Sequence, residues 1–281
     1  MILVIGATGN VGSEVVRGLA AAGASVRALT RDPAKVKVPE GVELAEGDLA
    51  RPETLAAAVR GVENVFLMAR APHLHEHVRH VVRAAEGAGV RHIVFLSSHA
   101  ADPESDAPLA RWHGEAENEL RASRMAWTMV RCGAFATNLL FFAQQVRERG
   151  ALPSWPSSDA RIAVVDPADI AAVATVALTQ PGHEEKTYLV TGPESLGMLE
   201  QTRILGEVLG RELVYEVLPD PVLLQIAQGL GLAEHAEAFV RQLRADGTGR
   251  ESHPTSTIHD VTGRAPRTFR QWAHDHANAF R

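Results

Sequence analysis

Two periodicities of apolar and polar positions alternate along the first half of the chain. Short runs rich in Val, Ile and Leu predict strands, and longer stretches whose apolar residues recur every three or four positions predict helices. The predicted strands are residues 2–5, 25–30, 42–45, 64–69, 92–97 and 127–131. The predicted helices are residues 11–22, 52–60, 75–88, 111–123 and 136–149. Nearly continuous apolar strands that alternate with helices predict an α/β fold, a doubly wound parallel sheet covered on both faces.

The pattern becomes less regular after Gly150. A passage rich in Pro and Ser, residues 152–159, predicts a loop, and Asp166 followed by Pro167 predicts a helix N-terminus. Further strands are predicted at 162–165, 188–191 and 213–218, and further helical segments at 199–209 and 221–245. We expect a first domain of residues 1–150 and a smaller C-terminal α/β lobe, residues 151–281, partly interleaved with it.

Composition narrows the classes of function. The net charge is −6, so the chain lacks the basic character that is usual in nucleic-acid-binding proteins. A single cysteine, Cys132, excludes an internal disulfide and a metal site built from several thiolates. The N-terminus has no basic segment of the secretory kind, and the longest uncharged stretch, 132–146, is shorter than the ~20 apolar residues that span a bilayer. We expect a cytoplasmic monomer or homodimer that binds neither nucleic acid nor membrane.

Three glycines spaced three residues apart, Gly6, Gly9 and Gly12, follow the first predicted strand and open the first predicted helix. In a dinucleotide-binding turn, the first glycine permits the tight turn, the second lets the backbone approach a pyrophosphate, and the third lets the helix pack on the strand. Unpaired N–H groups and the dipole of the helix then bind the anion. A tight turn without a ligand is the alternative, but the strand–turn–helix context favours a Rossmann-type cofactor site.

The end of the second predicted strand distinguishes NADP from NAD. An acidic residue at this point favours NAD, whereas an arginine accommodates the 2′-phosphate of NADP. Arg31 stands here, and Lys35 follows one helical turn later. Asp32 is the opposing signal, but its place before Pro33 is typical of a residue that caps a short helix. The sequence therefore predicts NADP(H), with a merely solvated Arg31 as the alternative.

The usual proton donor of such a fold is missing. The glycine turn and the serines Ser97 and Ser98 after the fifth predicted strand resemble the short-chain dehydrogenase/reductase superfamily, whose catalytic tyrosine precedes a lysine by four residues. The only tyrosines, Tyr188 and Tyr215, are followed at that spacing by glycine and proline. Carbonyl reduction with a tyrosine acid is therefore not expected.

Several further motifs resemble the NmrA-like branch of atypical short-chain dehydrogenases/reductases. They lie at residues 113–117, 120–123, 127–131, 135–138, 166–171, 188–193 and 262–266, so the resemblance covers essentially the whole chain. This branch includes type 2 quinone oxidoreductases, triphenylmethane-dye reductases, phenylpropanoid reductases and NADP sensors without catalytic activity. One departure is Cys132, since many relatives have proline between the residues that match Arg131 and Gly133, close to the expected nicotinamide.

The resemblance implies a role for individual residues. The pyrophosphate would be held by Gly6, Thr8, Gly9, Asn10, Val11 and Gly12, and the 2′-phosphate by Arg31 and Lys35. Asp48 and Leu49 would face the adenine, and Met68, Ala69 and Arg70 would lie along the ribose. Ser97, Cys132, Gly133 and Ala134 would surround the nicotinamide, and Phe135 and Asn138 would line the substrate pocket in front of the C-terminal substrate lobe.

Two residues near this expected site have alternative interpretations. His113 could deliver a proton near neutral pH and is the candidate catalytic residue. Alternatively, it is a structural histidine that pairs with Glu117, one helical turn later. Cys132 is interpreted as an inert buried thiol rather than a nucleophile, because no basic neighbour except Arg131 would lower its pKa.

The remaining candidates are a histidine cluster and an apolar segment. His73, His75, His77 and His80 are close in sequence, but no carboxylate or cysteine completes a ligand set, so a solvated face is favoured and no metal is expected. The apolar segment around residues 230–239 is either core or a lid over the substrate.

These observations together predict an NADPH-dependent oxidoreductase. A quinone-like or conjugated aromatic molecule would accept hydride directly, because its negative charge delocalises and a Tyr–Lys pair is not needed. The alternatives are a regulatory protein that senses NADP(H) without catalysis and a tailoring enzyme of polycyclic natural-product biosynthesis.

Overall fold

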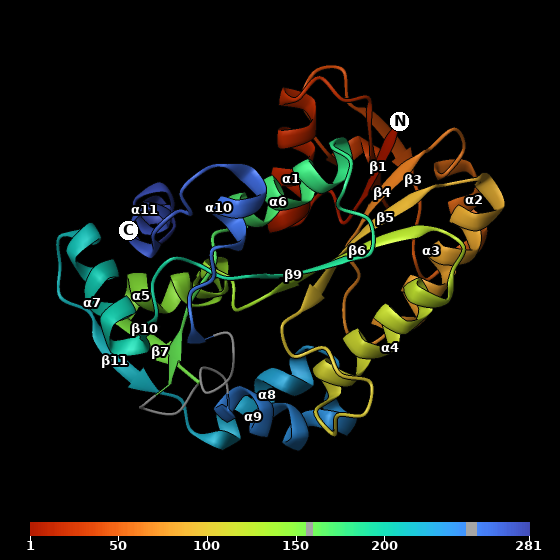
Figure 1. Cartoon of the computed structure of the whole chain (residues 1–281). Coiled ribbons are helices and arrows are strands. Elements are labelled where there is room, and N and C mark those ends of the chain that lie inside the picture. Colours follow the sequence, from red (N-terminus) through yellow and green to blue (C-terminus); the bar gives the residue numbers. More distant parts are fainter. Residues whose placement is uncertain (156–159, 246–251) are drawn as a thin grey trace.

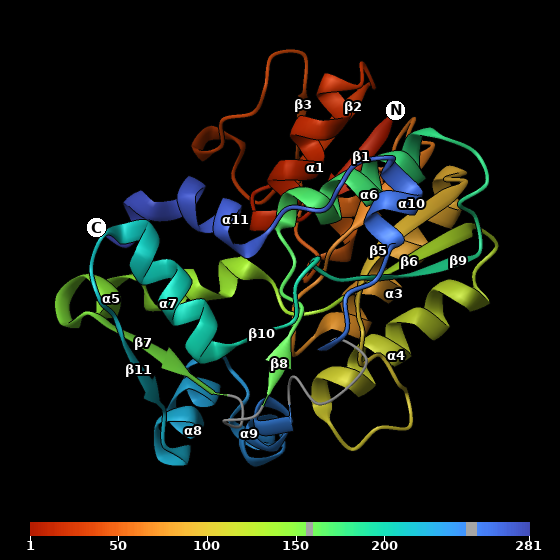
Figure 2. The same ribbon diagram turned by 60° about the vertical axis from the view of Figure 1, so that its left-hand side comes forward.

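The computed structural model describes residues 1–155, 160–245 and 252–281 (Figures 1 and 2). Within these residues lies a parallel seven-stranded sheet of order β3-β2-β1-β4-β5-β6-β9. Its strands are β1 (Ile2–Ile5), β2 (Val26–Thr30), β3 (Glu43–Glu46), β4 (Asn64–Leu67), β5 (His92–Ser98), β6 (Ala126–Cys132) and β9 (Lys186–Val190). The strand order reverses between β1 and β4, and ligands of open α/β sheets bind at the carboxyl ends of the strands beside such a point.

Helices cover both faces of this sheet. Successive side chains of each strand point to opposite sides, so each face has side chains against which helices pack. Leu3 and Ile5 pack against the first set of helices, α2 (Leu55–Ala58), α3 (Leu74–Ala88) and α4 (Pro108–Ala122). Ile2 and Val4 pack against the second set, α1 (Asn10–Ala21), α6 (Pro167–Thr179) and α10 (Thr257–Thr262). Figure 1 shows α1 and α6 on one side of the sheet and α3 and α4 on the other. The predicted doubly wound α/β fold is confirmed.

A smaller group of elements has a core of its own. Strand β7 (Ala151–Ser154) pairs in parallel with β11 (Val214–Val217), and β8 (Arg161–Ile162) pairs antiparallel with β10 (Leu196–Gly197). Helices α5 (Ala143–Arg149), α7 (Met198–Leu209) and α11 (Phe269–His276) enclose this core, in which Trp272 and Phe280 are fully buried. Strand β9 and helix α6 follow residue 150, yet β9 belongs to the large sheet and α6 packs against it. The division of the chain into two domains at residue 150 therefore stays a prediction.

A pair of helices, α8 (Asp220–Gly229) and α9 (Ala236–Ala245), lies beside α4 (Figure 1). The Trp112 ring on α4 meets the His235 ring edge-on, with 5.2 Å between their centroids. The predicted helical segment 221–245 is thus two helices, because Gly231 adopts a left-handed φ of +79° between them. None of the helices in the described parts of the chain is long and apolar enough to span a bilayer.

In three other segments the structure differs in detail from the prediction. The passage expected as a loop begins with strand β7. Pro153 is tolerated there because, among the described residues, β7 pairs with β11 alone and its other edge needs no N–H donor. The later part of that passage, 156–159, lies outside the described residues. The strand expected at 162–165 is limited to β8, and Val165 makes only an isolated bridge to Phe135. The helix expected at 136–149 starts as a tight 3₁₀ segment, Ala136–Phe142, before α5.

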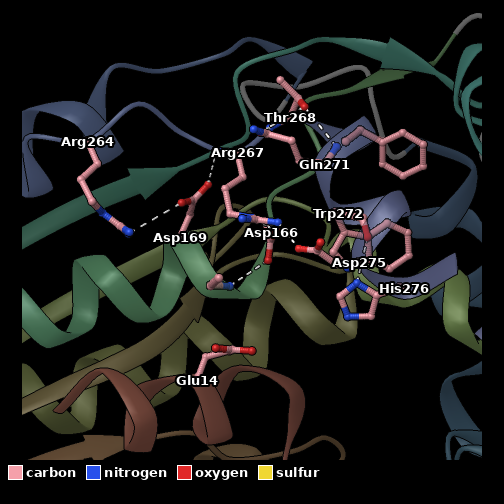
Figure 3. Close-up of polar contacts among 12 residues, drawn as sticks. Glu14, Asp166, Asp169, Arg264, Arg267, Thr268, Gln271, Trp272, Asp275 and His276 are labelled. Atoms are coloured by element: carbon pink, nitrogen blue, oxygen red, sulfur yellow. Dashed lines mark hydrogen bonds and ion pairs between the residues drawn. The ribbon is translucent and has the colours of Figure 1, made fainter. Parts of the chain in front are cut away.

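A cluster of ion pairs ties the C-terminal segment to α6 (Figure 3). Asp166 caps α6 by accepting a hydrogen bond from Ala168 N at 2.9 Å, which confirms the predicted helix start. Arg267 Nε donates to Asp166 at 2.6 Å, its backbone N–H donates to Asp169 at 2.6 Å, and its guanidinium also pairs with Asp275. This cluster attaches α11 of the small core to a helix of the large sheet.

Candidate cofactor and substrate site

The glycine turn has the geometry that a pyrophosphate needs. Gly6 has a φ of +82°, and a Cβ on Gly12 would stand 2.0 Å from the carbonyl oxygen of Gly6, so only glycine permits this close crossing. Gly9 precedes α1 without a side-chain cap, and the first turn of α1 has no acidic residue. The first N–H groups of the helix therefore remain available for an anion. Thr8 and Asn10 are exposed at this turn.

The end of β2 presents one unpaired cation. Arg31 is exposed and makes no hydrogen bond or ion pair within the described ranges, whereas the Lys35 ammonium lies 2.8 Å from the Asp32 carboxylate. Asp32 accepts a hydrogen bond from Ala34 N at 3.2 Å and caps the short 3₁₀ helix Pro33–Lys35, as predicted. The residues present therefore fit a dinucleotide with a 2′-phosphate, for which Arg31 is the available partner.

The residues expected beside the adenine and along the ribose have mostly local contacts. Asp48 accepts a hydrogen bond from Ala50 N at 3.0 Å, and the carbonyl of Leu49 lies 2.8 Å from His80 Nδ1. Met68 lies against the glycine turn, because a Cβ on Gly6 would meet Met68 Cβ at 3.0 Å. Of the residues expected along the ribose, Met68 and Ala69 line the cavity described below, whereas Arg70 is exposed and is not part of its lining.

A cavity of about 570 Å³ opens beside the carboxyl ends of β4, β5 and β6. Eight predicted residues besides His113 line it: Met68, Ala69, Ser97, Cys132, Gly133, Ala134, Phe135 and Asn138. The predicted pyrophosphate and 2′-phosphate residues are not among its lining, as expected if the cofactor reaches the cavity only with its nicotinamide. The volume falls within the ~300–1,000 Å³ of small-molecule sites.

The cavity wall is apolar, and the described residues that line it include no Lys, Arg, Asp or Glu. Helices α8 and α9 supply its outer side through Leu223, Ile226, Leu230 and Phe239. Phe239 is buried in the main core and Leu230 is 43% exposed, so the segment that was predicted to be core or lid contributes to the core at Phe239 and borders the cavity at both residues. The 76% exposed ring of Phe141 also borders the cavity, and the sequence pattern did not single it out.

A buried network of ion pairs centred on Glu117 lies next to the cavity and contacts it through Ser97. Glu117 on α4 has no exposed surface and accepts hydrogen bonds from Arg131 Nε and Nη2 at 2.7 and 2.6 Å and from Arg121 Nη2 at 2.7 Å. Ser97 Oγ donates to Glu117 at 2.7 Å, so this hydroxyl is already bound although Ser97 borders the cavity. Burial would raise the pKa of Glu117, but hydrogen bonds from Arg131 and Ser97 outweigh it and hold that pKa below its usual range.

This network replaces the expected pairing of His113 with Glu117. His113 Nδ1 instead lies 2.8 Å from the carbonyl of Leu109, one turn earlier on α4. Burial lowers the pKa of His113, opposed by the Leu109 hydrogen bond and the charge of Glu117, so the ring is neutral near pH 7. The ring borders the cavity.

The cysteine and the histidine cluster show no sign of reactive chemistry. Burial strongly raises the pKa of Cys132, whose Sγ lies 3.7 Å from the carbonyl of Val130, and this favours the inert thiol. His80 bonds to a backbone carbonyl, and His73 and His75 lie 3.5 and 3.6 Å from single glutamates. Within the described residues, no three His, Cys, Asp or Glu side chains gather as they would around a metal ion.

Neither tyrosine borders the cavity. The hydroxyl of Tyr188 lies 2.8 Å from His183 Nδ1, and the hydroxyl of Tyr215 donates to Ser154 Oγ at 3.2 Å. Both hydroxyls are therefore bound elsewhere.

The glycine turn, the exposed Arg31 and the apolar cavity at the same edge of a Rossmann sheet fit the class to which the chain belongs, the NADP(H)-dependent oxidoreductases. More narrowly, the chain belongs to the NmrA-like family, whose sequence profile matches residues 1–265.

Comparison with individual proteins agrees with this assignment. The whole chain is 40% identical to the NAD(P)H azoreductase of Xenophilus azovorans, of which 99% is covered. It is 41% identical, at the same coverage of both proteins, to (4-alkanoyl-5-oxo-2,5-dihydrofuran-3-yl)methyl phosphate reductase of Streptomyces griseus. The crystal structure of an NADPH-dependent quinone oxidoreductase from Escherichia coli with NADPH is similar at a TM-score of 0.83, with 26% identity over 98% of this chain and 99% of that one.

Proposed function

We propose that this protein reduces planar conjugated acceptors of the quinone or azo type by direct hydride transfer from NADPH, without a Tyr–Lys pair. The observation that carries this proposal is the apolar cavity bordered by Ser97 and Cys132–Ala134, the residues around which the nicotinamide is expected. Quinones and azo groups are the acceptors in the names of two similar proteins.

The reaction balances without a group from outside the complex and its solvent. NADPH supplies a hydride when bound, and a quinone takes up this hydride and one proton to become a hydroquinone while NADP⁺ is released. The negative charge that develops on a conjugated acceptor delocalises over its rings. Solvent water suffices as the proton source. His113 is not the donor, because its neutral ring carries its one hydrogen on Nδ1, which faces the Leu109 carbonyl.

The protein residues bind and orient the acceptor. Apolar side chains from α8 and α9 and aromatic rings such as Phe135 and Phe142 border the cavity and favour a flat apolar molecule over water. A positioned acceptor next to the cofactor reacts faster because orientation removes much of the entropic cost of a bimolecular step. Because no cationic side chain is among the described lining residues, the cavity favours quinones and azo compounds over a phosphorylated substrate.

The test is NADPH oxidation by purified protein with a panel of naphthoquinones, neutral azo dyes and phosphorylated butenolides. We expect acceptor-dependent loss of the NADPH absorbance band, faster with the first two classes. NADH is the control and should react more slowly. A protein that binds NADPH tightly but oxidises it with no member of the panel would instead be an NADP(H) sensor.

A further inference from the structure

We propose that His113 determines substrate specificity by accepting a hydrogen bond at Nε2 from an N–H or O–H group of the bound acceptor. The preferred substrates are then conjugated acceptors that carry such a donor on an aromatic ring attached to the reducible group. This inference rests on the proposed function, since it concerns the substrate of the same cavity.

The tautomer of His113 follows from its neighbour. Nδ1 lies 2.8 Å from the carbonyl oxygen of Leu109, which can only accept a hydrogen bond, so Nδ1 carries a hydrogen. A neutral imidazole has one ring hydrogen, and Nε2 therefore presents a lone pair. The charged form is disfavoured by burial and by His99, while Glu117 and the Leu109 hydrogen bond favour it less strongly.

The lone pair faces the cavity. Glu117, whose charge acts on His113 from the same helix, accepts hydrogen bonds from Ser97, Arg121 and Arg131. Among the residues that the structure describes, none is hydrogen-bonded to Nε2, and Nε2 is not one of the buried side-chain atoms left without a partner. Since the His113 ring borders the cavity, Nε2 is exposed to that space.

The surroundings make this acceptor selective. The neighbouring Leu109 and Phe95 are apolar, and the Phe95 and His113 rings lie 6.4 Å apart between centroids. A ligand that covers Nε2 with a methyl group removes its water without replacing the hydrogen bond, whereas an amino group of similar size supplies that bond. The expected discrimination is about tenfold.

The experiment uses the dyes 4-aminoazobenzene and 4-methylazobenzene with the wild type, His113→Leu and His113→Gln. It measures kcat and KM with NADPH, and dye dissociation constants on NADP⁺-saturated protein, where no hydride is available. Differences in dye reactivity cancel when the amino-to-methyl ratio is compared between variants. NADPH affinity checks that each variant is folded.

We expect the wild type to prefer the amino dye about tenfold in KM and in dissociation constant. The preference should disappear in His113→Leu and largely persist in His113→Gln, whose amide oxygen can accept the same hydrogen bond. An unchanged preference in His113→Leu overturns the assignment. Loss of the preference in Asn138→Ala or in Gln242→Ala alone would assign it to that side chain, since both line the cavity and Gln242 Oε1 has no hydrogen-bond partner among the described residues.

A second measurement does not depend on the variants. In ¹⁵N-histidine spectra of the wild type near neutral pH, we expect His113 Nε2 to carry no hydrogen and to shift when the amino dye binds. A hydrogen on Nε2 would overturn the proposal. Dye binding to the NADP⁺ form is informative even if no acceptor is reduced, so failure of the proposed function and failure of this inference are distinguishable.

Discussion

The residue that selects NADP over NAD should be Arg31 alone rather than Arg31 with Lys35. Arg31 has no partner in the described ranges, while Lys35 is held 2.8 Å from Asp32. We expect Arg31→Ala to raise KM for NADPH about tenfold to hundredfold, the value of a charge-assisted hydrogen bond, with little change for NADH. Steady-state kinetics with both cofactors measures this. Lys35→Ala is the control with a smaller effect, and an unchanged NADPH preference in Arg31→Ala contradicts the assignment.

We expect the stability of the fold to depend strongly on the buried charge of Glu117. Glu117→Gln removes a buried carboxylate and leaves Arg131 without its partner, which costs about 3 kcal/mol or more of unfolding free energy. The matched control is Glu119→Gln on the same helix, where a partly exposed ion pair with Arg79 contributes at most about 1 kcal/mol. Urea denaturation at pH 7 compares the two. Equal, small effects would mean that the buried network does not stabilise the fold.

Glu117 should also make the stability of the protein depend on pH, in a direction that follows from its lowered pKa. The folded pKa of Glu117 lies below its ordinary value of 4.5, so its stabilisation is complete above that pH and is lost as pH falls through the lowered pKa. We expect the stability gap between wild type and Glu117→Gln to be constant near neutral pH and to shrink below about pH 4.5. Thermal melts over this range provide the measurement, and a gap that widens in acid contradicts it.

At the scale of elements, the position of the α8–α9 pair depends on one arginine, Arg244. Arg244 on α9 donates to the Trp155 carbonyl at 2.9 Å and the Leu218 carbonyl at 2.6 Å, and it also pairs with Asp220 at 2.6 Å. These contacts hold the outer wall of the cavity to the ends of β7 and β11. We expect Arg244→Ala to raise KM for the acceptor several-fold to tenfold while NADPH affinity stays unchanged, because the wall loosens and the glycine turn does not.

The control for this prediction is Arg241→Ala on the same helix, whose exposed side chain has no partner among the residues described. It should leave both kinetic constants unchanged. An Arg244→Ala variant that weakens NADPH as much as the acceptor would show that the arginine supports the whole site rather than its outer wall.

Sequence periodicity predicted the elements of the large sheet because parallel strands are apolar throughout and their helices are amphipathic. The sequence also predicted the cofactor turn, because the close crossing of strand and helix there requires glycines at a fixed spacing. It failed for β7, where Pro153 argued against a strand, and for the partner of His113, because Glu117 bonds to Arg131, fourteen residues away on another element. Contacts between distant elements leave no periodic signal.

At the scale of the whole molecule, the two cores are joined through α6 and the C-terminal segment. Arg267 links Asp166 at the start of α6 to Asp275 on α11, and α11 carries Trp272 into the small core (Figure 3). Although the family profile ends at residue 265, the residues after it are therefore structural. The cavity is lined by residues of both cores, so its shape depends on how they are attached.

We expect Arg267→Met to lower the unfolding free energy by about 3 kcal/mol, because Asp166, with its side chain only 7% exposed, loses its cation. Arg264→Met is the matched control, since that 60% exposed guanidinium lies 4.0 Å from Asp169 and contributes at most about 1 kcal/mol. Urea unfolding is followed by far-UV circular dichroism and by the fluorescence of Trp272 in a background where Trp112, Trp127 and Trp155 are replaced by phenylalanine. Coincident transitions at a lower midpoint show one cooperative unit, whereas an earlier fluorescence transition shows that α11 and its core unfold before the sheet.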